Sequence, residues 1–131
     1  YTAGNDVSSR SIEGENPLYV PQAKVFDRCC AIGPCFVTAT TLGDPHNLMI
    51  HCSIFRDGAE VFSARASTSL MARKCWDLAN WLQRHNTIPS LTPVFTGTSI
   101  VPPLGFTLEE GDSVIIDIDG IGTLENDVVI V

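Results

Sequence analysis

Two charged side chains near the start of the chain, Asp6 and Lys24, could carry chemistry. Asp6 follows a predicted turn at Gly4–Asn5, and a carboxylate there would suit Mg²⁺ or Mn²⁺, which prefer hard oxygen donors. The alternative is a turn aspartate that bonds its own backbone. Lys24 lies between Ala23 and Val25. Its amine could point inward and bind a carboxylate or act as a base, or it could be an ordinary solvated lysine.

Arg10 and two nearby glutamates allow more than one interpretation. The guanidinium of Arg10 could grip a carboxylate through two parallel hydrogen bonds. It could equally form a structural ion pair with Glu13 or Glu15. The E-x-E spacing of these glutamates resembles a metal-binding pattern, but in a polar loop that contains glycine we expect them to be solvated.

The stretch TGTS at positions 96–99 places a glycine between hydroxyl residues. Such a loop can present backbone N–H groups and the hydroxyl of Thr98 to an anionic oxygen. The three histidines are scattered along the chain, and we assign none of them a catalytic role. These are His46, His51 and His85.

Size and composition predict one folded domain. The chain has 131 residues, of which 44% are hydrophobic and 18% charged, enough for a single core but not for two domains. The net charge of −7 argues against a nucleic-acid binder, which needs a basic face. No apolar run is long enough to span a bilayer. An anionic substrate would need a local cation or a metal ion to overcome the field of so acidic a protein.

The five cysteines match no zinc-binding spacing. We expect them to be small buried hydrophobic residues of a protein in a reducing compartment.

The first half of the chain shows short predicted strands separated by loops. Residues 1–7 read as a strand that runs into the turn at Gly4–Asn5. Residues 8–22 read as a long polar loop, residues 24–26 as a short strand, and residues 35–39 as a strand after a turn at Gly33–Pro34.

The second half contains clearer patterns. Alternating side chains around an Asp57–Gly58 turn predict a hairpin that begins near residue 48 and returns at residues 60–64. Residues 70–84 show the helical spacing of one buried face, with Ser67, Thr68 and Ser69 as candidate N-caps. That face is formed by Met71, Cys75, Leu78, Ala79 and Leu82. Residues 87–105 read as strand and loop broken by prolines. The alternation at 114–119 and the glycines 120 and 122 predict two closing strands. The fold class is therefore mainly β with one prominent helix, an α+β domain.

Several motifs together resemble the fumarylacetoacetate hydrolase superfamily across nearly the whole chain. They are GNDVSSR, a following lysine, CCAIGPCFVT, DPHNL, TGTSIVPP and LEEGDSVIIDIDGIGTLEN. Within that superfamily, IEGENPLYVPQAK and TGTSIVPP look most like dehydratases of 2-keto-3-deoxy sugar acids, such as 2-dehydro-3-deoxy-D-arabinonate or pentonate.

The resemblance implies a mixed β-sandwich roll around a metal centre, in a cytoplasmic homodimer without nucleic-acid or membrane partners. Residues 1–131 would form one catalytic domain, a C-terminal fragment that lacks upstream strands. Proteins of this superfamily hold Mg²⁺ with an upstream E-x-E pair and the aspartate of the NDVS block, which is Asp6 here. The resemblance therefore implies Mg²⁺, or Mn²⁺ in its place, for this chain. Glu13 and Glu15 follow Asp6 in the sequence, so they cannot be that upstream pair. A missing N-terminal segment or a second chain would then complete the site.

The resemblance also implies an activity. A 2-keto acid substrate would chelate the cation, lose a C3 proton and expel its C4 hydroxyl, giving a semialdehyde, which for a pentonate is 2-oxoglutarate semialdehyde. Lys24 would contact a substrate oxygen and shuttle a proton, Thr98 would bind the substrate carboxylate, and Ser9 and Arg10 would bind substrate or support the ligands. The alternatives are a C–C bond hydrolase of acylpyruvates and a non-catalytic member of the fold.

Overall fold

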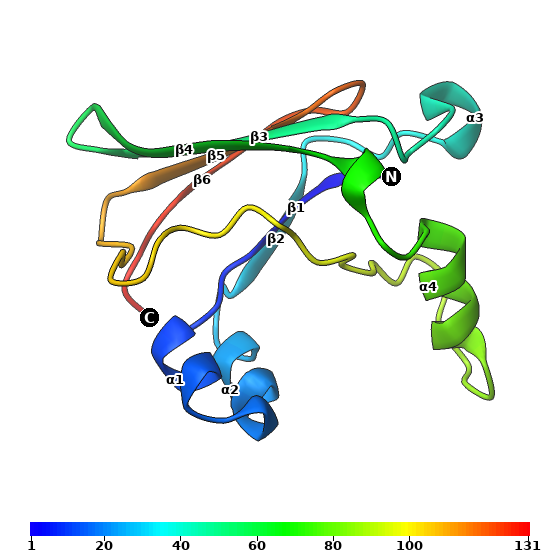
Figure 1. Cartoon of the computed structure of the whole chain (residues 1–131), viewed down its shortest axis with the longest axis horizontal. Helices are drawn as coiled ribbons and strands as arrows, with labels where there is room; N and C mark the ends of the chain where they lie inside the picture. Colours follow the sequence, from blue (N-terminus) through cyan, green and yellow to red (C-terminus); the bar gives the residue numbers. More distant parts are fainter.

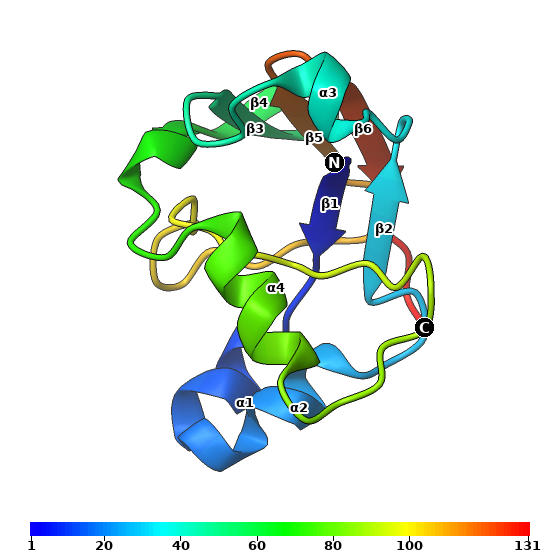
Figure 2. The same ribbon diagram turned by 90° about the vertical axis from the view of Figure 1, so that its right-hand side faces the viewer.

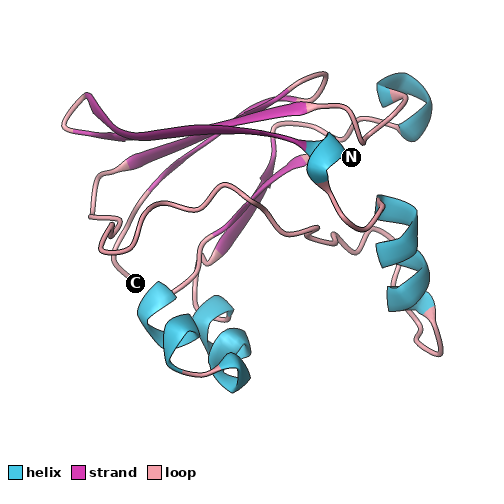
Figure 3. Cartoon of the chain, in the orientation of Figure 1, coloured by secondary structure: helices cyan, strands magenta, loops and turns pink.

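The structure is a computed structural model that describes residues 1–131, and it contains two antiparallel sheets with short helices around them (Figures 1 and 3). The strands are β1 (Ala3–Asp6), β2 (Cys30–Gly33), β3 (Met49–Arg56), β4 (Ala59–Ser67), β5 (Ser113–Ile118) and β6 (Gly122–Asp127). The helices are α1 (Arg10–Glu15), α2 (Val20–Lys24), α3 (Ala39–Leu42) and α4 (Cys75–Gln83), with 3₁₀ turns at Pro17–Tyr19 and Thr68–Leu70. The predicted class, mainly β with one prominent helix, is confirmed.

The larger sheet has the strand order β4-β3-β5-β6, and its two hairpins follow the sequence predictions. The β3–β4 hairpin turns at Asp57 and Gly58, whose φ angles of 50° and 77° suit a two-residue turn between twisted strands. The β5–β6 connection turns through Gly120, with φ 72°. Positive φ at these positions is the conformation that glycine and aspartate tolerate best.

The smaller sheet is the β1–β2 ribbon, which packs under the β5–β6 side of the larger sheet (Figure 2). Ala3 of β1 is fully buried there against Ile121 and Leu124. Since Ala3 has so small a side chain, the ribbon can approach the larger sheet closely at this point.

The predictions for the first 26 residues were wrong in three places. Gly4 and Asn5 lie inside β1, because the backbone there pairs with Ile32 and Ala31 of β2 instead of turning. Residues 8–22 form α1, a 3₁₀ turn and most of α2, where a loop was expected. Lys24 ends α2 and does not begin a strand.

Two local features explain the helices that the polar composition concealed. The Asn16 side chain accepts a hydrogen bond from the Leu18 amide at the start of the 3₁₀ turn. Pro17 and Pro21 stand at first-turn positions, where a missing N–H costs nothing. The prolines therefore begin these helical turns rather than break them.

The strand expected at residues 35–39 is absent, and the chain forms β2 just before it. Cys30–Gly33 pairs with β1, whereas in residues 35–39 only Val37 exchanges backbone hydrogen bonds with the start of the chain, at Tyr1. The carbonyls of Thr38 and Ala39 already accept the hydrogen bonds of α3. Gly33–Pro34 bends the chain, as predicted, through a cis peptide bond.

Helix α4 is shorter than predicted. Residues 68–70 form a separate 3₁₀ turn, which the Ser67 side chain caps, and α4 itself begins only at Cys75. Along the predicted face Met71, Cys75, Leu78 and Leu82 are half-buried, whereas Ala79 is exposed. The face is therefore only partly covered by this chain.

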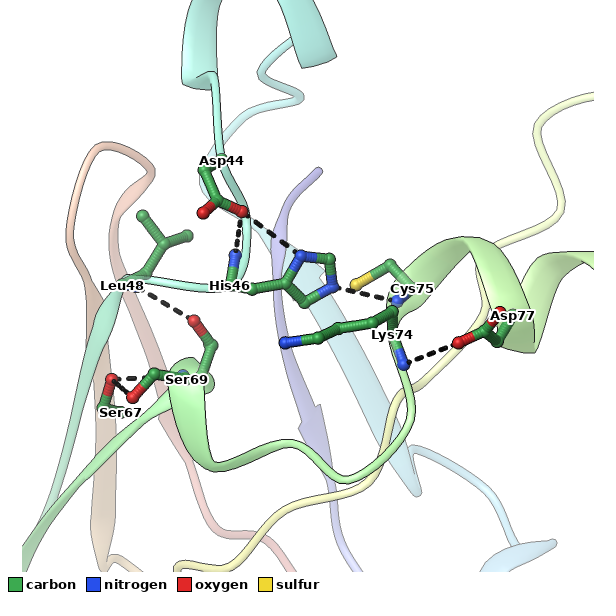
Figure 4. A network of polar contacts seen from close by, with 9 residues as sticks. Asp44, His46, Leu48, Ser67, Ser69, Lys74, Cys75 and Asp77 are labelled. Carbon is green, nitrogen blue, oxygen red and sulfur yellow. Dashed lines mark hydrogen bonds and ion pairs between the residues drawn. The ribbon is translucent and has the colours of Figure 1, made fainter.

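His46 attaches the N-terminus of α4 to the loop before β3 (Figure 4). Its Nε2 accepts a hydrogen bond of 3.0 Å from the Cys75 amide, and its Nδ1 lies 3.2 Å from Asp44 Oδ1. An imidazole protonated at Nδ1 satisfies both contacts. The ring is buried and meets Trp76 edge-on. His46 is therefore a structural residue, whose use could not be read from its sequence position.

The cysteines are less buried than expected. All five are free thiols, Cys30 and Cys35 are exposed, and the other three are half-buried. No helix combines the length and the apolar character needed to traverse a bilayer.

An ion pair between the half-buried Arg56 and the buried Asp112 joins β3 to the turn before β5. The carboxylate of Asp112 is fully buried and accepts hydrogen bonds of 2.8 Å from both Nε and Nη2 of Arg56. It also accepts the Glu109 amide at 2.9 Å. The guanidinium of Arg56 lowers the pKa of the Asp112 carboxyl, aided by the Glu109 amide and opposed by desolvation.

We expect Asp112→Asn to lower the melting temperature of the full-length protein at pH 7 by about 4 °C or more, because it removes a buried carboxylate that accepts hydrogen bonds from Arg56 and the Glu109 amide. Because the pKa of Asp112 is lower in the folded than in the unfolded protein, its carboxylate stabilises the fold at pH values above the unfolded pKa of about 4. This stabilisation is lost as the pH falls through the lower pKa of the folded state. The gap in melting temperature between wild type and variant should therefore narrow below about pH 4.

The matched control is Glu109→Gln, since Glu109 pairs with the same arginine from an exposed position. An exposed partner contributes little, so we expect a shift of no more than about 2 °C. Equal effects of the two variants in thermal unfolding would contradict the importance of the buried carboxylate.

Candidate active site

Asp6 and Lys24 meet at the end of β1, although eighteen positions separate them in the sequence. Lys24 Nζ lies 2.9 Å from Asp6 Oδ2, and both side chains are about one-third exposed, at 32% and 37%. Asp6 Oδ1 makes no hydrogen bond within the chain. One carboxylate oxygen is thus held by the lysine and the other is open to a further partner.

Two backbone contacts bring the lysine to the aspartate. The Ser9 amide donates to the carbonyl of Ala23 at 2.8 Å, which ties the start of α1 to the end of α2. The Val7 amide donates to the carbonyl of Cys29 at 2.9 Å and extends the β1–β2 pairing beyond Asp6. Both ends of the segment that carries Lys24 are therefore fastened next to Asp6.

Ser8 and Glu13 also lie around the lysine, and neither was among the predicted site residues. Ser8 Oγ accepts a hydrogen bond from Lys24 Nζ, and Glu13 Oε1 lies 3.9 Å from the same nitrogen. The helix α1 turns Glu13 back toward Lys24. Without knowledge of that helix, the sequence favoured a solvated Glu13, and only the E-x-E spacing marked it.

The side chain of Ser9 has little contact with the site. It begins α1 without capping it, and its only side-chain partner is Ser11 Oγ at 3.4 Å. Its backbone provides the connection to α2 described above, and its hydroxyl faces Ser11.

Arg10 pairs with neither Glu13 nor Glu15, so of the two alternatives left open for this residue the structural ion pair does not form. Its Nη1 donates instead to the carbonyls of Pro102, at 2.6 Å, and Pro103, at 3.2 Å. These prolines follow the TGTS stretch in sequence. Arg10 thereby connects α1 to a loop more than ninety positions away.

Thr98 is exposed in that loop, and its Oγ1 accepts a hydrogen bond of 3.0 Å from the Ile100 amide. Because the hydroxyl accepts this bond, its own proton remains available to donate to a ligand oxygen. Residues 92–103 have no regular secondary structure, so the strand component expected in residues 87–105 is absent.

The alternation of β1 places Asp6 and this loop on the same side of the strand. Asn5 points to the larger sheet, where its Nδ2 donates to Asn126 Oδ1 at 3.2 Å. Gly4 faces the opposite way, toward the ring of Phe95 in the loop. Since residues two apart in a strand share a face, Asp6 and the loop lie together.

Charges of both signs lie at the end of β1, where the carboxylates of Asp6 and Glu13 flank the Lys24 amine. Cys30, opposite Asp6 in the β1–β2 ladder, has a thiol whose pKa is raised by desolvation and then by Cys29 and the Asp6 carboxylate. Burial is the larger cause of this shift, and the charge of Asp6 is the smaller one.

The donor set fits a hard divalent cation in part. The open Oδ1 of Asp6 is the kind of oxygen that Mg²⁺ takes. The chain brings no group of three or more His, Cys, Asp or Glu side chains together as a complete metal site. Asp6 therefore offers one carboxylate oxygen to a cation, and the acidic, histidine and cysteine side chains of the chain do not gather into a complete site around it.

Comparisons with known proteins agree with this architecture. The chain is 58% identical over 128 residues to a "Probable 2-keto-3-deoxyxylonate dehydratase" of Haloferax volcanii, covering 98% of this chain and 44% of that protein. It is 44% identical over 124 residues to the "2-dehydro-3-deoxy-D-arabinonate dehydratase" of Saccharolobus solfataricus, covering 95% of this chain and 42% of that protein. The chain thus spans less than half the length of these relatives.

A solved structure gives the same match. A 2-keto-3-deoxy-D-arabinonate dehydratase "complexed with magnesium and 2,5-dioxopentanoate" superposes with a TM-score of 0.89 at 39% identity, over 97% of this chain and 45% of that one. The sequence profile described as "Fumarylacetoacetate (FAA) hydrolase C-terminal" matches residues 1–129. Because this profile covers almost the whole chain, the chain belongs to the fumarylacetoacetate hydrolase C-terminal family.

Proposed function

We propose that this chain supplies the metal-binding and substrate-binding half of a Mg²⁺-dependent dehydratase, which converts a 2-keto-3-deoxy sugar acid into a 2-oxo acid semialdehyde. The observation that carries the proposal is the Asp6 carboxylate, with one oxygen on Lys24 and the other open, on the face of β1 that meets the Thr98 loop. The two dehydratase relatives act, by name, on 2-keto-3-deoxy acids of five carbons.

Asp6, Thr98 and Lys24 would have three different roles. Asp6 would bind the cation through Oδ1, and the bound cation would stabilise negative charge that develops on the keto oxygen of the substrate. The hydroxyl of Thr98 would donate to the substrate carboxylate, because its oxygen already accepts from Ile100. Lys24, held by Asp6 and Ser8, would contact a substrate oxygen and hold or move a proton.

The overall reaction is an elimination of water. A proton leaves C3 and the hydroxyl leaves C4, which together make one water and a C3=C4 double bond, and two proton shifts within the product, from C5 and its hydroxyl to C4 and C3, then give the semialdehyde. For a pentonate the product is 2-oxoglutarate semialdehyde. The chain's own residues offer Lys24 as a proton carrier, and we expect the base that takes the C3 proton to lie outside residues 1–131.

Further parts of the proposal concern the assembly. Many large apolar side chains are exposed, among them Leu18 at 80%, Phe36 at 75% and Trp81 at 65%. Such surface favours cover by more polypeptide, and we propose a homodimer together with an N-terminal segment or second chain that completes the metal site. The free cysteines favour a reducing compartment, and we propose the cytoplasm.

The reaction itself can be tested with two substrates. We expect the full-length protein with Mg²⁺ to convert 2-keto-3-deoxypentonate into a product lighter by one water, measured by mass spectrometry, and to leave an acylpyruvate intact. Turnover of the acylpyruvate alone would remove the dehydratase assignment and favour the C–C bond hydrolase. Turnover of neither substrate would favour a non-catalytic member of the fold.

Asp6→Asn should weaken Mg²⁺ binding by about tenfold or more, because the amide oxygen lacks the charge that a hard cation prefers. The measurement is isothermal titration calorimetry on the full-length protein. Asp57→Asn is the matched control, since it removes the same charge at the exposed β3–β4 turn. Unchanged Mg²⁺ affinity in Asp6→Asn would show that Asp6 is no ligand.

Lys24→Met should separate cation binding from turnover. Removal of a positive charge 2.9 Å from Asp6 should leave Mg²⁺ affinity equal or tighter, while kcat falls by about 10²-fold or more with the loss of a proton carrier. Lys74→Met, at the start of α4, should change neither quantity by more than about twofold. A variant Lys24→Met with weak Mg²⁺ binding and unaltered kcat would contradict the assigned role.

A further inference from the structure

The loop that carries TGTS has no backbone support of its own. Between residues 93 and 102 no main-chain group takes part in a backbone–backbone hydrogen bond. The nearest such bonds run from the Thr92 amide to the Pro89 carbonyl and from the Phe106 amide to the Pro103 carbonyl. Figure 1 shows this segment, in yellow, crossing the molecule beside β1. Side-chain contacts must therefore decide where Thr98 lies.

The first such contact joins Phe95 to Gly4. A Cβ atom added to Gly4 would lie 2.6 Å from Phe95 Cε1, with two further ring atoms at 3.2 and 3.3 Å. Gly4 has ordinary strand backbone geometry, so conformational freedom does not explain the glycine. Its role is the close approach of the ring to the strand, since any side chain here would displace Phe95.

The second contact joins Arg10 to Pro102 and Pro103. One guanidinium nitrogen, Nη1, donates to both carbonyls, at 2.6 and 3.2 Å. A charged donor strengthens these hydrogen bonds, and the position is partly buried. Arg10 thus holds the loop at the residues that follow the TGTS stretch in sequence.

The two contacts lie on either side of the TGTS stretch in one segment and on either side of Asp6 in the other. Phe95 precedes TGTS and Pro102 follows it, while Gly4 lies two residues before Asp6 and Arg10 four residues after it. We propose that these contacts form a two-point clamp, Gly4–Phe95 and Arg10–Pro102/Pro103, that sets the distance between Asp6 and Thr98. The inference rests on the proposed function and makes Arg10 a positioning residue for the substrate-carboxylate site rather than a substrate ligand.

The test uses Gly4→Ala and Arg10→Gln, each of which breaks one contact. In the full-length protein we expect both to raise KM for 2-keto-3-deoxypentonate by about tenfold or more, because misplacement by about 1 Å costs much of a positioning effect. Mg²⁺ affinity by calorimetry should stay within about threefold, since Asp6 keeps its place in β1. Gly14→Ala is the matched control, because an added Cβ meets no atom within 4 Å there.

A second readout does not depend on activity. Limited proteolysis with subtilisin, with cleavage sites mapped by mass spectrometry, should cut residues 92–104 about fivefold faster in both variants than in wild type or Gly14→Ala, since the loop must detach to be cleaved. Phe95→Leu combined with Gly4→Ala should restore KM toward wild type, because the smaller side chain makes room. This rescue distinguishes a clamp from a general loss of folding.

The outcomes separate the clamp from the activity. Unchanged proteolysis of residues 92–104 in both variants would overturn the clamp. A raised KM in Arg10→Gln alone, with Gly4→Ala like wild type, would also overturn it and would make Arg10 a direct substrate ligand. Faster proteolysis in both variants of a protein with no dehydratase turnover would support the clamp while the proposed function fails.

Discussion

The alternation of side chains along β1 is the constraint on which the candidate site depends. Pairing with β2 extends the strand through Asp6, so successive side chains must face opposite ways. One face, with Ala3 and Asn5, packs on the larger sheet. The other face presents Gly4 and Asp6 to the loop and to α2. A shift of one residue in the β1–β2 register would exchange the two faces and turn the carboxylate into the core.

Charge gives the lysine of the site its particular importance. The chain carries a net charge of −7, so its overall field repels an anionic keto acid. Lys24 is the one cation that the fold brings to Asp6, and its position between Asp6, Ser8 and Glu13 keeps it there. A lysine with three oxygen partners can orient a carboxylate, but it cannot by itself neutralise a substrate carboxylate and a developing charge. A divalent cation bound at Asp6, as proposed, would supply the remaining positive charge.

Some of the fold could be predicted because its signals are local. The β3–β4 hairpin has alternating side chains on both sides of Asp57–Gly58, and both the pattern and the turn lie within twenty residues. The predictions for the first 26 residues were wrong because the structure there depends on contacts with distant segments. Gly4–Asn5 has turn composition, yet the strand conformation there depends on β2, which lies some 25 positions further along. Polar composition made residues 8–22 look like a loop, and the prolines at first-turn positions do not by themselves distinguish a helical turn from a loop.

The sequence by itself determined the residue types of the site, through the order of NDVSSR, the lysine and TGTS, and it also determined the strand-rich class. Only the tertiary structure decided which of these residues touch. It turned Arg10 away from the glutamates and onto Pro102 and Pro103, brought Ser8 and Glu13 to Lys24, and placed the TGTS loop on the face of Asp6. The physical reason is that these contacts join segments up to 93 positions apart, and no periodicity or turn signal in a sequence reports a contact that only the packing of sheet, ribbon and loop creates.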